Sequence, residues 1–242
     1  MKDWSQERDK IVTWLQKMVR KAGAKGLVLG LSGGLDSSVA AVLSKIAFSE
    51  NTFGLILPCH SLLQDQQDAE LIAQKYAIPY RILPLDLVYD TLLSLLSEKY
   101  TKPLPLSLAN IIPRLRMTVL YYFAQKENYL VCGATNKSEL TVGYYTKYGD
   151  GGVDLMPLAH LTKTEIWQFA EFLGIPAAII KKAPSAGLWE DQTDEKEMGI
   201  TYAVLDRFIQ TKQGNQSEIT KIKNMIERTH HKRQLPPRLE RL

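Results

Sequence analysis

The sequence predicts an α/β protein whose parallel sheet carries helices on both faces. Short apolar runs typical of strands recur four times, near residues 27–31, 53–57, 80–83 and 129–133. Apolar residues at helical spacing fill the intervals between them, at about 36–48, 65–77, 87–98 and 108–127. Strand and helix in alternation indicate a parallel sheet, because each parallel connection needs a crossover, which is usually a helix.

Helices are also expected outside this alternating region. Residues 4–21 place apolar side chains at helical spacing, and after residue 134 strand patterns stop and helices are expected at about 162–173, 195–212 and 216–229. No repeat or composition break forces a second domain. We therefore expect a single domain over residues 1–242, with a core at about 25–175 and a helical, basic C-terminal part at about 176–242.

Composition excludes several classes of protein. The 242 residues are 45% hydrophobic and 23% charged, which is ordinary for a soluble protein. The two cysteines, Cys59 and Cys132, form neither a disulfide framework nor a metal-binding pair, so a cytoplasmic location is expected. The N-terminus is too charged for a signal peptide and no apolar run reaches 18 residues, so no membrane association is expected. Cys59 and His60 are adjacent in an extended segment and point to opposite faces, which argues against a catalytic pair.

Positive charge is concentrated at the C-terminus. Residues 221–242 contain seven Lys or Arg and two Glu, which gives +5, whereas the rest of the chain carries −1. Such a tail is compatible with nucleic-acid binding, with binding of a phosphorylated small molecule, or with a solvated chain end.

The segment 30–38, GLSGGLDSS, joins the first predicted strand to the next helix. Gly33 and Gly34 allow positive φ and close approach to an anion, serine hydroxyls add donors, and the free N–H groups of the new helix point to the same place. A carboxylate beside phosphates is repelled unless a divalent cation lies between them, so Asp36 predicts a Mg²⁺ ligand in a pyrophosphate-binding loop. The alternative is that the glycines only make a turn and Asp36 interacts with the helix dipole.

A second polar segment, 133–139, also follows a predicted strand and enters a helix. Asn136 and Glu139 fit a helix capping box, which is a sufficient explanation of Glu139 taken alone. Further along, the segment 144–154 combines three tyrosines with glycines and charges, which favours burial or stacking over a plain flexible loop. Upstream, Arg114 and Arg116 lie early in a helix within an apolar stretch, and this pairing indicates an anionic partner.

Together these segments resemble the ammonia-dependent NAD⁺ synthetases, a family of the N-type ATP pyrophosphatase superfamily with an adenine nucleotide alpha hydrolase-like, Rossmann-type fold. The resemblance covers nearly the whole chain and rests on residues 32–38, 114–117, 136–139, 146–154, 161–163, 182–186, 192–195 and 231–233. The motif at 32–38 is shared by the whole superfamily and does not distinguish its members. The segments 146–154 and 231–233 make the resemblance specific to NAD⁺ synthetase.

The resemblance implies a two-step ligase reaction. The nicotinate carboxylate of deamido-NAD⁺ attacks the α-phosphorus of ATP, giving an acyl adenylate and pyrophosphate, and ammonia then displaces AMP to form NAD⁺. It implies no enzyme nucleophile, a homodimer, Mg²⁺ as cofactor, and ATP, deamido-NAD⁺ and ammonia as small-molecule partners. The residues implied for ATP are Gly30, Leu31, Ser32, Gly33, Gly34, Leu35, Asp36, Ser37, Ala134, Lys163 and Ser185. Those implied for deamido-NAD⁺ are Arg114, Lys147, Asp154, His231 and Lys232, and those implied for Mg²⁺ are Asp36 and Glu139.

Two features qualify this resemblance. The family usually has Gly-Thr at the end of the fourth strand, whereas this chain has Ala134 there, so its backbone or the neighbouring Thr135 must serve ATP. Free ammonia is expected as donor because the synthetase motifs already fill the chain and leave no room for a glutaminase domain.

Two rival functions are considered. A tRNA-modifying enzyme that adenylates RNA needs a larger basic surface than this short tail. A non-catalytic nucleotide-binding module has no use for Asp36 paired with Glu139.

Overall fold

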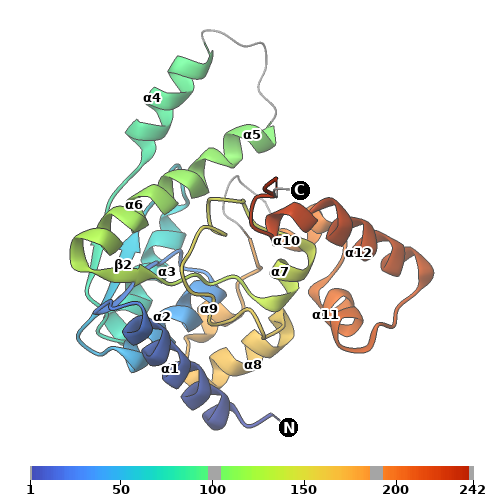
Figure 1. Cartoon of the computed structure of the whole chain (residues 1–242), viewed down its shortest axis with the longest axis horizontal. Helices are drawn as coiled ribbons and strands as arrows, with labels where there is room; N and C mark the ends of the chain where they lie inside the picture. Colours follow the sequence, from blue (N-terminus) through green and yellow to red (C-terminus); the bar gives the residue numbers. More distant parts are fainter. Residues whose placement is uncertain (1, 98–104, 186–192, 240–242) are drawn as a thin grey trace.

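Four parallel strands form the central sheet in the computed structural model, which describes residues 2–97, 105–185 and 193–239 (Figure 1). The strands are β1 (Gly26–Gly30), β2 (Thr52–Ile56), β3 (Tyr80–Ile82) and β4 (Tyr129–Val131). Their order is β3-β2-β1-β4, and all three pairings are parallel. The chain thus winds outward from β1 in both directions. The crevice at such a switch point, beyond the carboxyl ends of the strands, is where open α/β sheets bind ligands.

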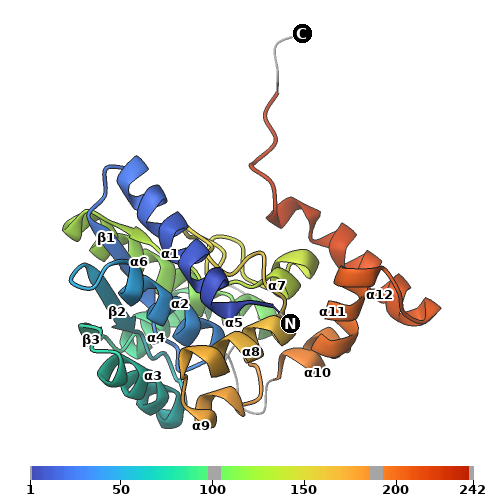
Figure 2. The same cartoon turned by 90° about the horizontal axis from the view of Figure 1, so that it is seen from below.

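Helices cover both faces of this sheet, as predicted (Figures 1 and 2). One face packs against α1 (Trp4–Lys21), α2 (Leu35–Ala47), α3 (Leu63–Lys75) and α8 (Lys163–Leu173). The other packs against α6 (Ile111–Glu127), with α4 (Asp86–Ser97) beside it. Side chains of β1 alternate between the faces, since Leu27 and Leu29 join the first apolar cluster and Val28 joins the second.

The last three helices form a third apolar cluster with α7 (Lys137–Val142). They are α10 (Asp194–Met198), α11 (Tyr202–Thr211) and α12 (Gln216–Arg228), followed by the 3₁₀ turn η1 (His230–Lys232). This cluster joins Val142 of α7 to Tyr202, Leu205 and Ile222, whereas the short α9 (Ala177–Ile180) contributes Ile179 to the first cluster. Figure 2 shows α10, α11 and α12 gathered at one side of the sheet and its covering helices. No helix of the described residues is long and apolar enough to span a membrane.

Several predicted boundaries were wrong. The helix expected at 195–212 is two helices, α10 and α11, because Gly199 ends the first at φ +63 and Thr201 caps the second. The helix expected at 108–127 is preceded by a separate α5 (Pro105–Ala109). The fourth strand ends at Val131, although Cys132 still forms a parallel bridge with Leu155. Residue 98 of the predicted helix 87–98, and residues 240–242 of the basic tail, lie outside the described residues.

Candidate active site

The loop between β1 and α2 forms a tight turn against α3. Gly33 has φ +75, and a Cβ on it would lie 2.2 Å from the carbonyl oxygen of Asp65, so only glycine fits. Gly34 is the N-cap of α2 and has no side chain to occupy the helix N-terminus. The hydroxyls of Ser32 and Ser37 lie 2.8 Å apart on the same loop. Backbone N–H groups and hydroxyls therefore converge where a 13-residue helix begins, which is a geometry that binds anions.

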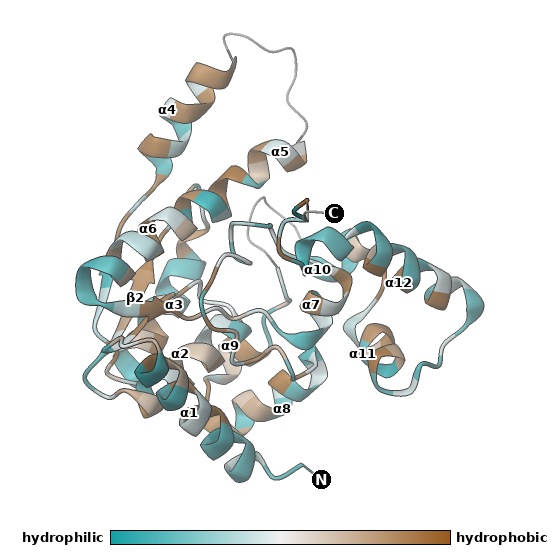
Figure 3. Ribbon diagram, viewed as in Figure 1, coloured by the Kyte–Doolittle hydropathy of each residue, from teal (hydrophilic) through white to brown (hydrophobic). Residues whose placement is uncertain are grey.

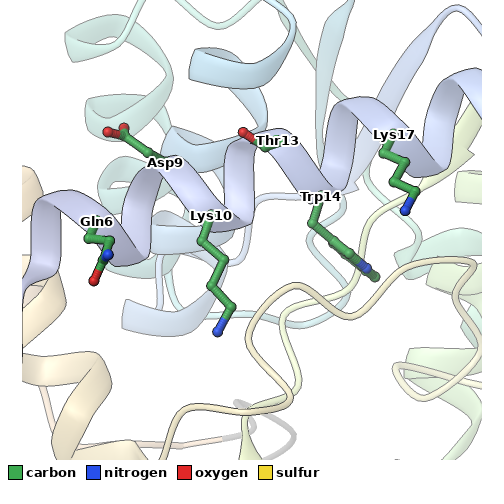
Figure 4. A pocket seen from close by; sticks show the side chains of 6 residues that line it. All are labelled: Gln6, Asp9, Lys10, Thr13, Trp14 and Lys17. Carbon is green, nitrogen blue, oxygen red and sulfur yellow. The ribbon is translucent and has the colours of Figure 1, made fainter.

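A cavity of about 970 Å³ opens above this loop, beyond the carboxyl ends of β1, β2 and β4. Predicted site residues that line it are Gly30, Leu31, Ser32, Gly34, Leu35, Asp36, Ser37, Ala134, Glu139, Lys163, Ser185 and Lys232. Thr135 lies on the same wall as Ala134. A second, open hollow lies along α1 and is lined only by residues of that helix (Figure 4). The polar side chains singled out from the sequence thus meet at the first cavity.

Lys163 is the centre of the charged cluster in this cavity. Its side chain is only 3% exposed, its Nζ forms a close ion pair with Asp36, and Oε1 of Glu139 lies 4.0 Å away. Asn136 donates a hydrogen bond of 3.1 Å to the other oxygen of Asp36. The predicted capping box is also present, with Asn136 and Glu139 bonded reciprocally. Glu139 therefore caps its helix and faces Asp36 and Lys163 as well, so the two interpretations of this residue coexist.

The electrostatics of the cluster favour an additional cation. Burial raises the pKa of Glu139 well above its ordinary value, repulsion from Asp36 adds to this, and attraction from Lys163 only partly opposes it. Burial alone lowers the pKa of Lys163, but Asp36 and Glu139 reverse the effect and hold it above its ordinary value. Two half-buried carboxylates that share one ammonium group are the oxygen donors that Mg²⁺ prefers. In the described part of the chain, however, no cluster of three or more His, Cys, Asp or Glu has the geometry of a metal site.

Asp206 of α11 was missed by the sequence analysis and lies directly behind this cluster. It is 2% exposed, and its two carboxylate oxygens accept the hydroxyl of Ser138 and, at 2.8 Å, the backbone N–H of Thr164. The Ser138 hydroxyl in turn accepts the backbone N–H of Lys163 at 3.0 Å. Asp206 therefore joins the beginnings of α7 and α8 and fixes the separation of Glu139 and Lys163. The only sequence signal was an acidic residue within the apolar stripe of α11.

Tyr202 and Asp194 are two further buried polar residues without a predicted role. The Tyr202 hydroxyl donates to Oδ2 of Asp194 at 2.8 Å and lies 3.5 Å from Oε1 of Glu139. Burial raises the pKa of Asp194 despite the attraction of Lys163. Asp194 and Glu197 both line the cavity, and this acidic group adds to its negative charge.

The residues predicted to hold deamido-NAD⁺ fall into two groups. Lys232 lines the cavity and donates to the carbonyl oxygens of Gly143 and Tyr145, at 2.8 and 2.6 Å. Lys147 donates to the backbone of His231 at 2.8 Å, and Arg114 donates to the backbone of Lys147 at 3.4 Å. These last three residues are not among those lining the cavity within the described ranges. In this conformation they tie the C-terminal turn to the tyrosine-rich loop 144–154.

Asp154 likewise lies outside the cavity lining, and both its oxygens are engaged. They accept the backbone N–H of Val131 at 2.8 Å and the hydroxyl of Tyr121 at 3.1 Å, which completes the edge of β4. By contrast, Arg116 does line the cavity, and it donates to the carbonyl of Leu57 and the hydroxyl of Ser61. Of the two arginines noted in the sequence, the structure thus brings Arg116 rather than Arg114 to the cavity.

The switch-point cavity, the anion-binding loop and the cluster of Asp36, Lys163 and Glu139 define an α/β protein with a charged, anion-binding site at the carboxyl ends of its strands. Comparison with known proteins specifies the family. The NAD synthase family model matches residues 7–236, and this chain belongs to that family.

Named relatives agree with this assignment. An NH(3)-dependent NAD(+) synthetase of Carboxydothermus hydrogenoformans is 49% identical over 235 residues, which cover 97% of each chain. The structure of an NMN synthetase from Francisella tularensis has a TM-score of 0.94 at 37% identity and covers 99% of both chains. That of an NH3-dependent NAD synthetase from Campylobacter jejuni has a TM-score of 0.83 at 30% identity and covers 99% of this chain and all of the other.

Proposed function

We propose that this protein is a ligase that amidates deamido-NAD⁺ (nicotinic acid adenine dinucleotide) with ammonia at the expense of ATP, giving NAD⁺, AMP and pyrophosphate as the last step of NAD⁺ biosynthesis. The observation that carries the proposal is the joining of the anion-binding loop and the Asp36–Lys163–Glu139 cluster in one cavity. Membership of the NAD synthase family supports it. Free ammonia as donor is supported by the name of the Carboxydothermus relative.

In this proposal the protein positions substrates and stabilises charge. The backbone of residues 30–37, with the hydroxyls of Ser32 and Ser37, holds the ATP phosphates at the N-terminus of α2. Lys163 and the cavity-lining Ser185 face the same phosphates, and Lys163 neutralises charge that develops on the departing pyrophosphate. Most of the remaining rate acceleration comes from holding the nicotinate carboxylate in line with the α-phosphorus. No covalent enzyme nucleophile is required.

The residues present fit Mg²⁺. Asp36 and Glu139 both lie close to the Lys163 ammonium group. Their two negative charges favour a cation in the space between the two carboxylates. We propose that these two carboxylates, with phosphate oxygens and waters, hold the ion, in keeping with the preference of Mg²⁺ for few protein ligands. When bound, Mg²⁺ polarises the phosphates and stabilises negative charge on the leaving group.

The substrate residues that lie outside the cavity lining remain part of the proposal. Lys232 lines the cavity in this structure, whereas Arg114, Lys147, Asp154 and His231 are not among its lining residues in the described part of the chain. Lys147 and Lys232 join η1 to the loop 144–154 through hydrogen bonds to backbone carbonyls. We propose that these bonds break when the nicotinate substrate binds, so that the two lysines bind its phosphates instead.

A homodimer is proposed from an exposed apolar surface on α4, α5 and α6. Its members are Leu87, Val88, Leu95, Leu96, Leu106 and Tyr122, with exposed fractions from 43% to 79%. Figure 1 shows α4 projecting from the body of the protein, and Figure 3 shows apolar residues along it. A patch of this kind is costly in water and is typical of an interface. Leu95→Glu is expected to give monomers in sedimentation velocity, and a monomeric wild type would contradict the proposal.

A cytoplasmic location is proposed because both cysteines are buried and unpaired.

The test is a reconstitution with ATP, Mg²⁺, ammonium and deamido-NAD⁺. NAD⁺ and AMP are expected in equal amounts, and with glutamine as the sole donor almost none is expected. Omission of deamido-NAD⁺ is the control, since AMP release must then cease. Formation of ADP and inorganic phosphate in place of AMP and pyrophosphate would contradict the proposal.

A second candidate substrate is the mononucleotide, nicotinate mononucleotide, with NMN as the product. It is favoured by the TM-score of 0.94 to the Francisella NMN synthetase, against 0.83 for the Campylobacter NAD synthetase. Both substrates share the nicotinate carboxylate and its ribose phosphate, so the acyl-adenylate chemistry is the same. The ratio of kcat/KM for the two substrates in one assay decides between them, because specificity is a difference in transition-state binding.

A further inference from the structure

Lys182 joins two elements that meet at the cavity, the segment after α9 and the first turns of α3. Its Nζ donates to Oδ1 of Asp65 and to Oδ2 of Asp68, each at 2.6 Å. The other oxygen of Asp68 accepts the side-chain amide of Gln64 at 2.8 Å. The side chains of Lys182, Asp65 and Asp68 are 30%, 21% and 9% exposed. These two ion pairs are therefore better shielded from water than ordinary surface pairs, which contribute little.

The two aspartates belong to the surface against which the anion-binding loop packs. A Cβ on Gly33 would lie 2.2 Å from the carbonyl oxygen of Asp65 and 3.0 Å from the Cβ of Asp68. Asp65 also lines the cavity. A carboxylate so close to an anion-binding turn repels phosphates unless a cation neutralises it. Burial by itself lowers the pKa of Lys182, but its hydrogen bonds to Asp65 and Asp68 raise this pKa above the ordinary value, so the ammonium group stays charged.

Lys182 also attaches one end of a stretch of the cavity wall. Residues 182–185 all line the cavity, and they end at Ser185, which the proposed function places at the phosphates. At that end the carbonyl oxygen of Pro184 accepts the backbone N–H of Asp194 at 3.0 Å. On the other side of Lys182, Ile179 of α9 is buried in the first apolar cluster. The bonds of Lys182 to α3 therefore set how far Ser185 lies from the anion-binding loop.

We propose that Lys182 is a positioning residue for the triphosphate of ATP, an inference that rests on the proposed function. Through Asp65 and Asp68 it holds the segment 182–185 against the helix that supports Gly33. It also neutralises one of the two negative charges of this aspartate pair, which lowers the repulsion that bound phosphates meet. Lys182 bonds the carboxylates and not the nucleotide, so its effect on ATP passes through the aspartates.

The test measures the Kd of α,β-methylene-ATP, with Mg²⁺ present, by isothermal titration calorimetry. Lys182→Met is expected to raise this Kd by roughly tenfold or more, because two charge-assisted hydrogen bonds are lost beside the phosphates. Lys182→Arg keeps the charge and should recover most of the affinity.

Two lysine variants are the controls. Lys181→Met removes the same charge from the exposed neighbouring residue, which is not among the described residues that line the cavity, and should keep the wild-type Kd. Lys75→Met removes another lysine bond of α3, to the Gly174 carbonyl, away from the cavity lining of the described ranges. It should lower the melting temperature and leave the Kd unchanged. An equal rise of Kd in Lys75→Met and Lys182→Met would overturn the proposal, because it would reduce the role of Lys182 to stability.

A double-mutant cycle tests whether Lys182 acts through the aspartates. Asp68→Asn keeps the shape of its side chain, should raise the Kd by roughly threefold or more, and serves alone if Lys182→Met does not fold. In the Lys182→Met background, Asp68→Asn is expected to weaken binding no further, because the contact that it removes is already absent. Multiplied effects would overturn the proposal and make Lys182 a direct ligand of ATP. Failure of the wild type to form the amide refutes the proposed function, whereas an unchanged Kd in Lys182→Met refutes the role of Lys182 alone.

Discussion

Glu139→Gln separates the two roles that the structure gives this residue, helix capping and cation binding. Glutamine keeps the hydrogen bond from the Asn136 backbone and thus the capping box, which contributes about 1 kcal/mol. It removes one of the two carboxylates near Lys163 and leaves the close pair with Asp36 intact. The metal-free variant is therefore expected to be less stable than the wild type by no more than about 1 kcal/mol at neutral pH.

The effect on cation binding is expected to be much larger. Wild-type protein in Mg²⁺ at a hundredfold excess over its Kd gains about 2.7 kcal/mol of stability, and the variant should lose most of this gain. Turnover should fall by roughly a hundredfold or more, because charge stabilisation by a metal contributes several kcal/mol. The assays are thermal melts with and without Mg²⁺ and AMP release at saturating Mg²⁺. Near-normal turnover in the variant would show that Glu139 is only a capping residue.

The same pair of proteins gives a signed pH prediction. The pKa of Glu139 is raised in the folded state above its ordinary value of 4.5. Its protonated form therefore stabilises the fold fully below pH 4.5, and this stabilisation is lost as the pH rises through the raised pKa. Glutamine does not titrate, so the stability of the metal-free wild type should fall relative to the variant as the pH rises from about 5 to 8. Denaturant melts across this range measure it, and a relative gain by the wild type would refute the burial argument.

Three more predictions concern the surrounding residues and the nitrogen source. Lys232→Ala should raise the KM for the nicotinate substrate with a much smaller effect on ATP, whereas Lys221→Ala, whose ammonium group bonds the exposed Gly199 carbonyl, should change neither. Equal, negligible effects would remove Lys232 from the site. Asp206→Asn should lower kcat roughly ten- to a hundredfold with KM values nearly unchanged, since it sets the positions of Lys163 and Glu139. Thr201→Ala, which removes the cap of the same helix, is the control, because it should lower the melting temperature without that loss of kcat. Turnover at fixed total ammonium should rise with pH as the neutral fraction rises, and comparable rates with purified glutamine would contradict the choice of donor.

The fold was predictable because local signals and the tertiary structure agree. Strand and helix alternate at short intervals up to residue 131, and the glycine turn at 33–34 marks a loop where close backbone approach is required. The error at 195–212 had a visible cause, since the apolar pattern continues through Gly199 although Gly199 and Thr201 are typical helix stop and start residues. The short α9 has too few residues to show a period.

The site was predictable only where its residues lie in motifs. Asp36, Glu139 and Lys163 each begin a helix after a polar segment, so their chemistry is visible locally. Asp206 contacts Ser138 and Tyr202 contacts Glu139 across 68 and 63 positions of the sequence, which no local pattern records. Arg114 and Arg116 differ by two positions on one helix, and only the packing of α6 decides that Arg116 lines the cavity. Contacts between distant segments are therefore what the sequence could not supply.

The most direct test of the proposed reaction is the fate of the carboxylate oxygen. Deamido-NAD⁺ labelled with oxygen-18 in the nicotinate carboxylate is incubated with the protein, ATP, Mg²⁺ and ammonium. The oxygen-18 content of the released AMP is then measured by mass spectrometry. If the carboxylate attacks the α-phosphorus and ammonia then displaces AMP, each AMP carries one labelled oxygen. AMP without label would contradict the acyl-adenylate and with it the role given to this cavity.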